Sequence, residues 1–265
     1  MTRAAARASL ALGLLAGAAV AAVAQDTSAV PAVPAVPARH MLSVDTSRVR
    51  PFRRAYDMIV HTKDSAIVIG QRELALSPAT YAGSPVWMLV ETRTGIAPAA
   101  ETLYIAPELR PLHWNASLRG ARLGATFVGD TIFGATSAPA GRHSLILAGR
   151  PDLLVSQPMI ELVLPLLPLA TEWTDSAAVL AVDLAAGTVI PVEISVIGEE
   201  SVQIDSSGAH QAWMVAVRAD ARTILLWIDR ETGDVQRVQQ PLPPHVGTML
   251  EYRRRAEVIQ APPPT

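Results

Sequence analysis

The sequence predicts a mainly β protein: a strongly twisted antiparallel sheet, open like half of a barrel, with a short apolar helix against its concave face. Three observations lead to this fold class. Short β-rich runs separated by turn residues fill most of the chain from Phe52 onward. One run in each half contains a Trp-Met pair, and between the two halves lies an apolar segment, residues 151–169, without strand alternation.

The first half shows the turn chemistry of hairpins. Residues 56–60 and 66–70 are mostly apolar and flank the polar residues 62–65, which is a hairpin pattern. A second hairpin is predicted around Gly129 and Asp130, because these residue types tolerate the positive φ of tight turns. Strands are expected again in the second half, including residues 189–197 and 201–204.

The middle segment is rich in leucine and interrupted by proline. Its length and continuous apolarity favour a helix of two or three turns over about residues 151–164. Pro158, Pro165 and Pro168 interrupt or bound that helix. The segment is too apolar to remain in water, so it covers part of the concave face, either as a lid over a cavity or as a plug in the core.

The two halves share an internal echo. Residues 83–90 contain Trp87-Met88, and residues 208–217 contain Trp213-Met214. In each half this strand leads to a second strand, an acidic turn and a third strand. The echo predicts two related meanders joined in one continuous sheet.

The N-terminus resembles a secretory signal. Arg3 and Arg7 precede an uncharged apolar stretch over residues 8–20, and Ala22-Val23-Ala24 forms a small-x-small cleavage site. An uncleaved membrane helix is the alternative, but the apolar run is short for a span. We expect cleavage near Ala24, a periplasmic or secreted protein, and no transmembrane span in the mature chain. The predicted organisation is a signal peptide at 1–24, an Ala/Val/Pro-rich linker at 25–50, one β-rich domain at 51–255 with halves of about 51–150 and 170–255, and a disordered tail at 256–265.

Composition and motifs give no support for catalysis. The 22 basic and 24 acidic residues lack the positive excess of a nucleic-acid-binding protein. There are no cysteines, so the chain has no thiolate nucleophile or thiolate metal ligand. None of the six histidines pairs with another at helical spacing, and no Gly-x-Ser-x-Gly elbow occurs. We therefore expect no catalytic residues, no metal site and no cofactor.

The tryptophans are the most informative candidates for a binding site. Large aromatic side chains on a curved sheet can form the wall of an apolar cavity, although they can equally pack as ordinary core. The candidate cavity wall combines tryptophans of the predicted strands with leucines of the middle segment: Trp87, Trp114, Leu162, Leu166, Trp213 and Trp227.

The order of motifs in residues 151–253 resembles a family of bacterial periplasmic domains of unknown function. The resemblance rests on Leu-Pro-Leu at 167–169, a Gly-Glu element at 198–202, a Leu-Trp strand at 226–229 and a turn-strand at 233–238. That family is similar in architecture to the periplasmic lipoprotein carriers (Lol-type), whose curved sheet and helical lid enclose acyl chains. The resemblance implies no catalytic residues.

Two functions are consistent with these observations. The first is a non-catalytic periplasmic or envelope-associated module that binds an apolar, lipid-like ligand, with a lipid, a lipoprotein or another envelope protein as its partner. The second is a structural or protein-interaction β domain with a filled core and no ligand. An enzyme such as a hydrolase has no supporting motif.

Overall fold

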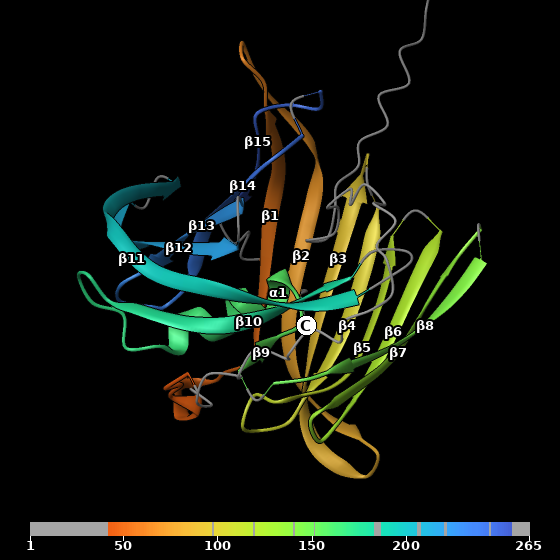
Figure 1. Ribbon diagram of the computed structural model, residues 1–265. Helices are drawn as coiled ribbons and strands as arrows, with labels where there is room; N and C mark the ends of the chain where they lie inside the picture. Colours follow the sequence, from red (N-terminus) through yellow and green to blue (C-terminus); the bar gives the residue numbers. More distant parts are fainter. Residues whose placement is uncertain are drawn as a thin grey trace, which may run out of the picture.

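A computed structural model describes residues 42–255 apart from 97, 119, 140, 151, 183–186, 206–207, 220–221 and 244. Its strands form one sheet of 15 strands that is not closed into a barrel (Figure 1). Among these described residues, one short α-helix, α1, accompanies the sheet. The predicted fold class, a mainly β protein with an open twisted sheet and a short apolar helix, is therefore confirmed.

The first half of the chain forms one wing of the sheet, a meander in which each strand pairs with the next. The alternation of polar and apolar residues explains these strands, since alternate side chains face the core. Their bounds are β1 Phe52–His61, β2 Ala66–Tyr81, β3 Ser84–Gly95, β4 Ala99–Ile105, β5 Pro111–Leu118, β6 Ala121–Val128, β7 Thr131–Ala138 and β8 Gly141–Ala148.

The second half forms the other wing. Its bounds are β9 Leu153–Leu154, β10 Thr174–Val182, β11 Gly187–Asp205, β12 Gly208–Ala219, β13 Arg222–Asp229, β14 Val235–Pro241 and β15 Met249–Arg254. The pairings are antiparallel with one exception, because β9 pairs with β10 in parallel. The two wings join at the centre, where β1 pairs with β15, for example at Ile59 and Glu251.

Twist brings the two wings toward each other, so that β10 and β11 cross in front of the first wing in Figure 1. At the start of β11, Gly187 lies close to β8 of the opposite wing. A Cβ at this position would come within 3.0 Å of Leu147 Cδ1. The end strand β8 thus approaches β11 of the other wing in space, although the two are not hydrogen-bonded neighbours in the strand order.

The longest strand, β11, differs from the two separate strands expected at 189–197 and 201–204. It is continuous, but its register against β12 shifts between Val196 and Gly198. Such a bulge bends a strand without ending it. Beyond the bulge, β11 curls over the second wing, and Figure 1 shows this curvature clearly.

The middle helix is shorter than the expected span of 151–164. Helix α1 covers Gln157–Val163 and continues into the 3₁₀ turn η2, Leu164–Leu166. Proline explains the boundary: Pro158 lies in the first helical turn, where a missing backbone N–H removes no helical hydrogen bond. Upstream, Leu153 and Leu154 form strand β9 instead of helix.

The main core lies between the concave face of the sheet and α1. An inward row of directly paired residues crosses five strands of the first wing: Leu76, Leu89, Leu103, Trp114 and Ala125. All five are buried and belong to one core cluster that also includes the apolar residues of α1. A second, small cluster surrounds Trp227 on the other face of β12 and β13.

Residues 42–50, which the sequence analysis places in the linker, contact the domain where the structure describes them. They include the 3₁₀ turn η1, Thr46–Arg48. The backbone N–H of Asp45 donates to the carbonyl of Leu166 at 3.0 Å, and Val49 is buried in the main core. None of the described helices has the length and apolarity that a membrane-crossing helix requires.

Candidate functional site: a buried ionic cluster

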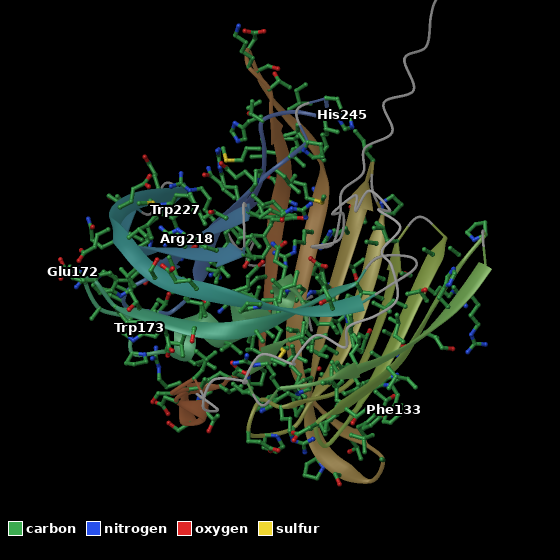
Figure 2. The ribbon with its side chains drawn as sticks, viewed as in Figure 1. Phe133, Glu172, Trp173, Arg218, Trp227 and His245 are labelled. Atoms are coloured by element: carbon green, nitrogen blue, oxygen red, sulfur yellow. The ribbon has the colours of Figure 1, made fainter. Side chains whose placement is uncertain are left out.

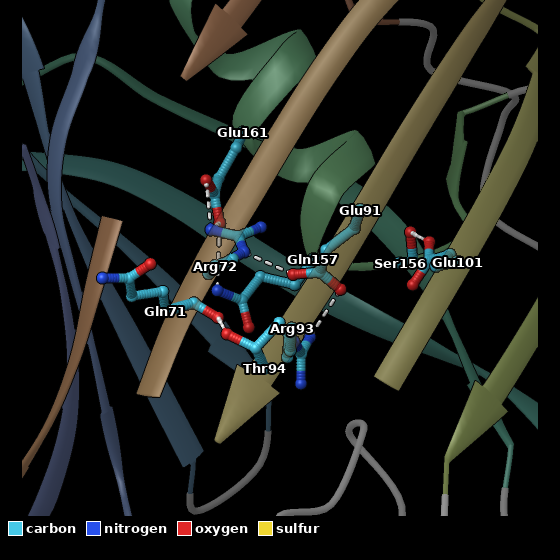
Figure 3. A network of polar contacts seen from close by, with 9 residues as sticks. All are labelled: Gln71, Arg72, Glu91, Arg93, Thr94, Glu101, Ser156, Gln157 and Glu161. Carbon is cyan, nitrogen blue, oxygen red and sulfur yellow. Dashed lines mark hydrogen bonds and ion pairs between the residues drawn. The ribbon is translucent and has the colours of Figure 1, made fainter. Parts of the chain in front are cut away.

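Five charged side chains meet beneath α1 in the main core (Figure 3). We call them the buried ionic cluster: Arg72 of β2, Glu91 and Arg93 of β3, Glu101 of β4 and Glu161 of α1. Their exposed fractions lie between 0 and 7%. Charged groups this deeply buried are rare unless they are paired, so their contacts need a full account.

The register of three adjacent strands places four of the five. Arg72 lies directly opposite Arg93, and Glu91 lies directly opposite Glu101. Like charges in opposite positions across a sheet repel each other. The cluster is therefore unfavourable as two isolated cross-strand pairs and depends on contacts between the arginines and the carboxylates.

Arg72 is the centre of these contacts. Its Nη1 donates to both carboxylate oxygens of Glu161 at 2.8 Å, and its Nε donates to Glu91. Arg93 Nη2 donates to the other oxygen of Glu91 at 2.8 Å. Gln157, one turn before Glu161 on α1, donates to Glu161 Oε1 at 2.9 Å. The helix is thus fixed to the sheet by hydrogen bonds between charged groups, which are stronger than neutral ones.

Two tyrosines complete the surroundings of Arg72. Its guanidinium lies 4.7 Å from the centre of the Tyr252 ring and 5.3 Å from that of Tyr56. Cation–π contacts of this kind gain strength where water is excluded. Burial, with a contribution from Glu161, raises the pKa of Tyr56 to about 12, so this tyrosine is uncharged near neutral pH.

The fifth member, Glu101, has no arginine of its own. Its hydrogen-bond partner is the hydroxyl of Ser156, the residue that precedes α1. Burial and the nearby Glu91 raise the pKa of Glu101 to about 7, despite opposing effects of Ser156 and Arg93. Burial also disfavours the charged form of Glu91, but Arg93 and Arg72 outweigh it and lower the pKa of Glu91.

Counting charges explains why Glu101 differs. Two arginines face three carboxyl groups, so the cluster is neutral when one carboxyl group carries a proton. Glu91 and Glu161 each hydrogen-bond to an arginine, which leaves Glu101 as the carboxyl group that holds the proton. The cluster therefore binds one proton with a pKa close to neutral.

Chemically, the cluster is suited to holding a helix rather than to transforming a substrate. A serine beside a carboxyl group could in principle react, but Ser156 and Glu101 are 4% and 5% exposed, so solvent does not reach them. In the part of the chain that the structure describes, no group of three or more His, Cys, Asp or Glu side chains is placed to hold a metal ion.

The six residues predicted as a cavity wall are only partly brought together. Trp114, Leu162 and Leu166 are buried in the main core, and the half-buried Trp87 and Trp213 pack against it. Trp227 is buried on the opposite face, in the second cluster. It belongs to β13 of the second wing, where Figure 2 labels it. The register explains why Trp213 and Trp227 lie on opposite faces of the sheet. Trp227 pairs with Met214 and Trp213 pairs with Ile228, so the two tryptophans are one residue out of phase.

The buried ionic cluster was not predicted from the sequence, although two signals were present. Arg72 is in phase with Leu74 and Leu76, and this spacing places its side chain on the core face of a strand. Glu161 is the only charged residue in the apolar run between Leu153 and Leu167. A charge in each of two core-facing elements indicates a buried pair, because an isolated buried charge is costly.

These features define an open β-sheet protein whose concavity is filled by a helix that an ionic cluster holds in place. No protein-family model matches the sequence. The comparison with curated proteins gives no match. Among solved structures, the chain is similar to a β-barrel-like protein of the domain of unknown function DUF1849 from Brucella abortus. The identity is 12% and the TM-score 0.48, covering 82% of this chain and 97% of the other. A likeness at this level carries no argument about function.

Proposed function

We propose that this protein is a non-catalytic module of the bacterial cell envelope that binds a protein partner through the outer surface of its sheet. The observation that carries the proposal is the burial of α1. Six of its seven residues are buried, and Leu162 and Leu166 are 5% and 7% exposed. A helix enclosed to this extent occupies the place that an internal ligand would need.

The outer surface offers apolar groups next to a sheet edge. Phe133 of β7 and Ile146 of β8 lie directly opposite each other and are 47% and 71% exposed. Strand β8 is at the end of the strand order. Figure 2 shows Phe133 on the first wing, far from Trp227. Exposed apolar pairs and edge strands both favour association with another protein.

The compartment in this proposal rests on the N-terminal sequence. Arg3, Arg7 and the small residues Ala22-Val23-Ala24 have the order of a secretory signal. Protein recovered from the periplasm should begin near Gln25. An intact mass that retains residues 1–24 would contradict export with cleavage.

A second candidate is the carrier of an apolar, lipid-like ligand in which α1 acts as a displaceable lid. One observation favours it: polar contacts hold α1 near both ends, through Ser156 to Glu101 and through Glu161 to Arg72. A helix held by few ionic contacts can be released by a change in charge. In this case the ligand would replace α1 against the concave face.

Replacing Leu162 and Leu166 together with Ser distinguishes the two candidates. If α1 is a plug, the free energy of unfolding of the double variant falls by several kcal/mol and the domain unfolds. Each serine leaves a cavity and buries a hydroxyl group in the core. The wild type then binds no apolar fluorescent probe. If α1 is a lid, the wild type binds the probe, and the double variant stays folded but binds more weakly. Circular dichroism and probe fluorescence measure both properties.

Leu169 provides the matched control, since it is a leucine of the same segment that is only half-buried. Leu169→Ser should lower the melting temperature far less than the double variant. Probe binding by the wild type, together with a folded double variant, would overturn the proposal of a closed interior.

A further inference from the structure

A polar pocket lies where β11 curls back over the second wing. It has a volume of about 110 Å³, and we call it the β11 pocket. Its wall includes Glu200 and Ser201 of β11, Gln236 and Arg237 of β14, and Arg253 of β15. Strands β12 and β13 separate β11 from β14 in the sheet, so only the curl brings these residues together.

The curl is fixed by one glutamate that contacts two other strands. Glu200 Oε1 accepts a hydrogen bond from Arg237 Nη2 at 2.8 Å, and its Oε2 accepts one from Trp227 Nε1 at 2.6 Å. The Arg237 guanidinium lies 3.8 Å from the centre of the Trp227 ring. The hydrogen bond to Glu200 and the contact with the Trp227 ring together fix the orientation of Arg237 at the pocket.

Two arginines of neighbouring strands lie side by side in the wall. Arg237 and Arg253 lie directly opposite each other on neighbouring strands, a placement that is unfavourable without negative charge nearby. Glu200 balances Arg237, and Glu251 balances Arg253 through contacts of 2.6 and 2.7 Å. Arg254 also lines the pocket, but it pairs with Asp234 at 2.5 Å, so Arg237 and Arg253 are the two arginines available to a ligand.

Two buried polar atoms at the pocket lack a partner among the described residues. One is Arg237 Nε, whose N–H has no acceptor. The other is Gln236 Oε1, which has no donor although the residue is only 4% exposed. Unpaired buried polar atoms cost free energy, and a bound group that both accepts and donates would satisfy the two atoms together.

We propose that the β11 pocket binds a phosphate group that carries one proton. Its unprotonated oxygens would accept from Arg237 Nε and from Arg253, and its O–H would donate to Gln236 Oε1. Arginine suits this ligand because its planar group matches the oxygens of phosphate. The volume fits a single small group, since pockets for drug-sized molecules measure about 300–1,000 Å³. Free phosphate and the phosphate monoester of a lipid share this chemistry.

Calorimetric titration of the full mature chain with inorganic phosphate tests the proposal, with sulfate as the comparison. We expect binding of phosphate in the millimolar range and weaker binding of sulfate, because sulfate has no proton to donate to Gln236. Arg253→Gln should weaken phosphate binding about tenfold, the loss expected for one charged hydrogen bond. Arg253 is 53% exposed, so this variant should fold normally.

Arg230 provides a matched control on the same curl. It contacts Glu199 at 2.6 Å and lies 4.3 Å from the Trp213 ring, yet it does not line the pocket. Arg230→Gln should leave the phosphate Kd unchanged. Absence of binding by the wild type, sulfate binding as tight as phosphate, or an equal loss in both variants would each overturn the proposal.

Vesicles distinguish the two sources of phosphate. If the protein sediments with vesicles containing phosphatidic acid but not with pure phosphatidylcholine, the phosphate belongs to a lipid head group. If only the free ion binds, the ligand is soluble. The pocket lies away from the helix-filled core, so the two proposals are tested independently. A wild type that binds no phosphate would leave the proposal of a closed interior intact, and an open interior would leave phosphate binding intact.

Discussion

The buried ionic cluster and the β11 pocket use the same residue types but differ in their contact with water. In the cluster, the side chains of Arg72 and Glu161 are both 0% exposed. At the pocket, the side chains of Arg237 and Glu200 are 19% and 43% exposed. The comparison shows that burial decides the role of a charge pair. Removing one partner in the buried ionic cluster leaves an uncompensated buried charge, which is costly. At the β11 pocket, water can solvate the remaining charge, and the open side leaves room for a ligand.

The largest expected effect is on the inner pair. Glu161→Leu leaves Arg72 buried with only a shared contact to Glu91, so the free energy of unfolding should fall by about 3–5 kcal/mol. Urea unfolding followed by circular dichroism measures this loss. Glu193→Leu is the control, because Glu193 is 60% exposed and pairs with the surface residue Arg218 at 3.0 Å. This control should change stability by less than about 1 kcal/mol.

A double variant sharpens the same prediction. Combining Glu161→Leu with Arg72→Met replaces a buried ion pair by apolar side chains, and such replacements are often neutral or stabilising. The remaining pair, Arg93 and Glu91, stays balanced at 2.8 Å. The double variant should therefore recover most of the stability lost by Glu161→Leu. If the double variant is less stable than Glu161→Leu, Arg72 stabilises the fold through more than its pairing with Glu161.

The next effect is a dependence of stability on pH that comes from Glu101. Its pKa is raised from 4.5 to about 7 in the folded protein. The folded state therefore holds a proton that the unfolded state has lost, so stability falls as the pH rises between these values. The slope should be about 1.4 kcal/mol per pH unit, or roughly 3 kcal/mol across the window.

Glu101→Gln removes this dependence. A glutamine keeps an oxygen for the Ser156 hydroxyl but cannot ionise, so the variant should be more stable than the wild type at pH 8 and similar at pH 5. Other carboxylates contribute outside this window, because the lowered pKa of Glu91 makes its contribution disappear only as the pH falls below about 4.5. A wild type equally stable at pH 5 and pH 7 would contradict the assignment of the proton to Glu101.

The smallest effect is expected at the pocket. The hydrogen bond from Arg237, more than the contact with Trp227, lowers the pKa of Glu200. Glu200 is 43% exposed, so Glu200→Gln should cost less than about 1 kcal/mol in the same unfolding measurement. A loss comparable with that of Glu161→Leu would show that solvent access does not separate the two regions.

Much of the fold follows from local patterns in the sequence. The alternation in β2, the turn at Gly129 and Asp130, and the apolar run before Leu167 all predict elements that the structure contains. The exceptions depend on distant contacts. Leu153 and Leu154 become a strand because they pair with Ala178 and Val179 of β10, and no local pattern contains that partner.

The candidate sites were harder to predict for the same reason. Trp227 was expected beside Trp114 in one cavity wall, but the side it faces depends on register, and a shift of one residue reverses it. The β11 pocket depends on a bulge between Val196 and Gly198 that bends one strand over its neighbours. The sequence contains the residues of these sites, but their proximity is a property of the folded sheet.

The pairing of β1 with β15 at the centre of the sheet has a consequence for the order of folding. Residues such as Ile59 and Glu251 are neighbours in space although nearly the whole domain separates them along the chain. Each wing can form from contacts between successive strands, but the seam between the wings requires residues 249–254. Until then, β1 is an exposed edge whose unpaired backbone can pair with another chain. We therefore expect this seam to form after the two wings, since contacts between distant residues have the higher cost of loop closure.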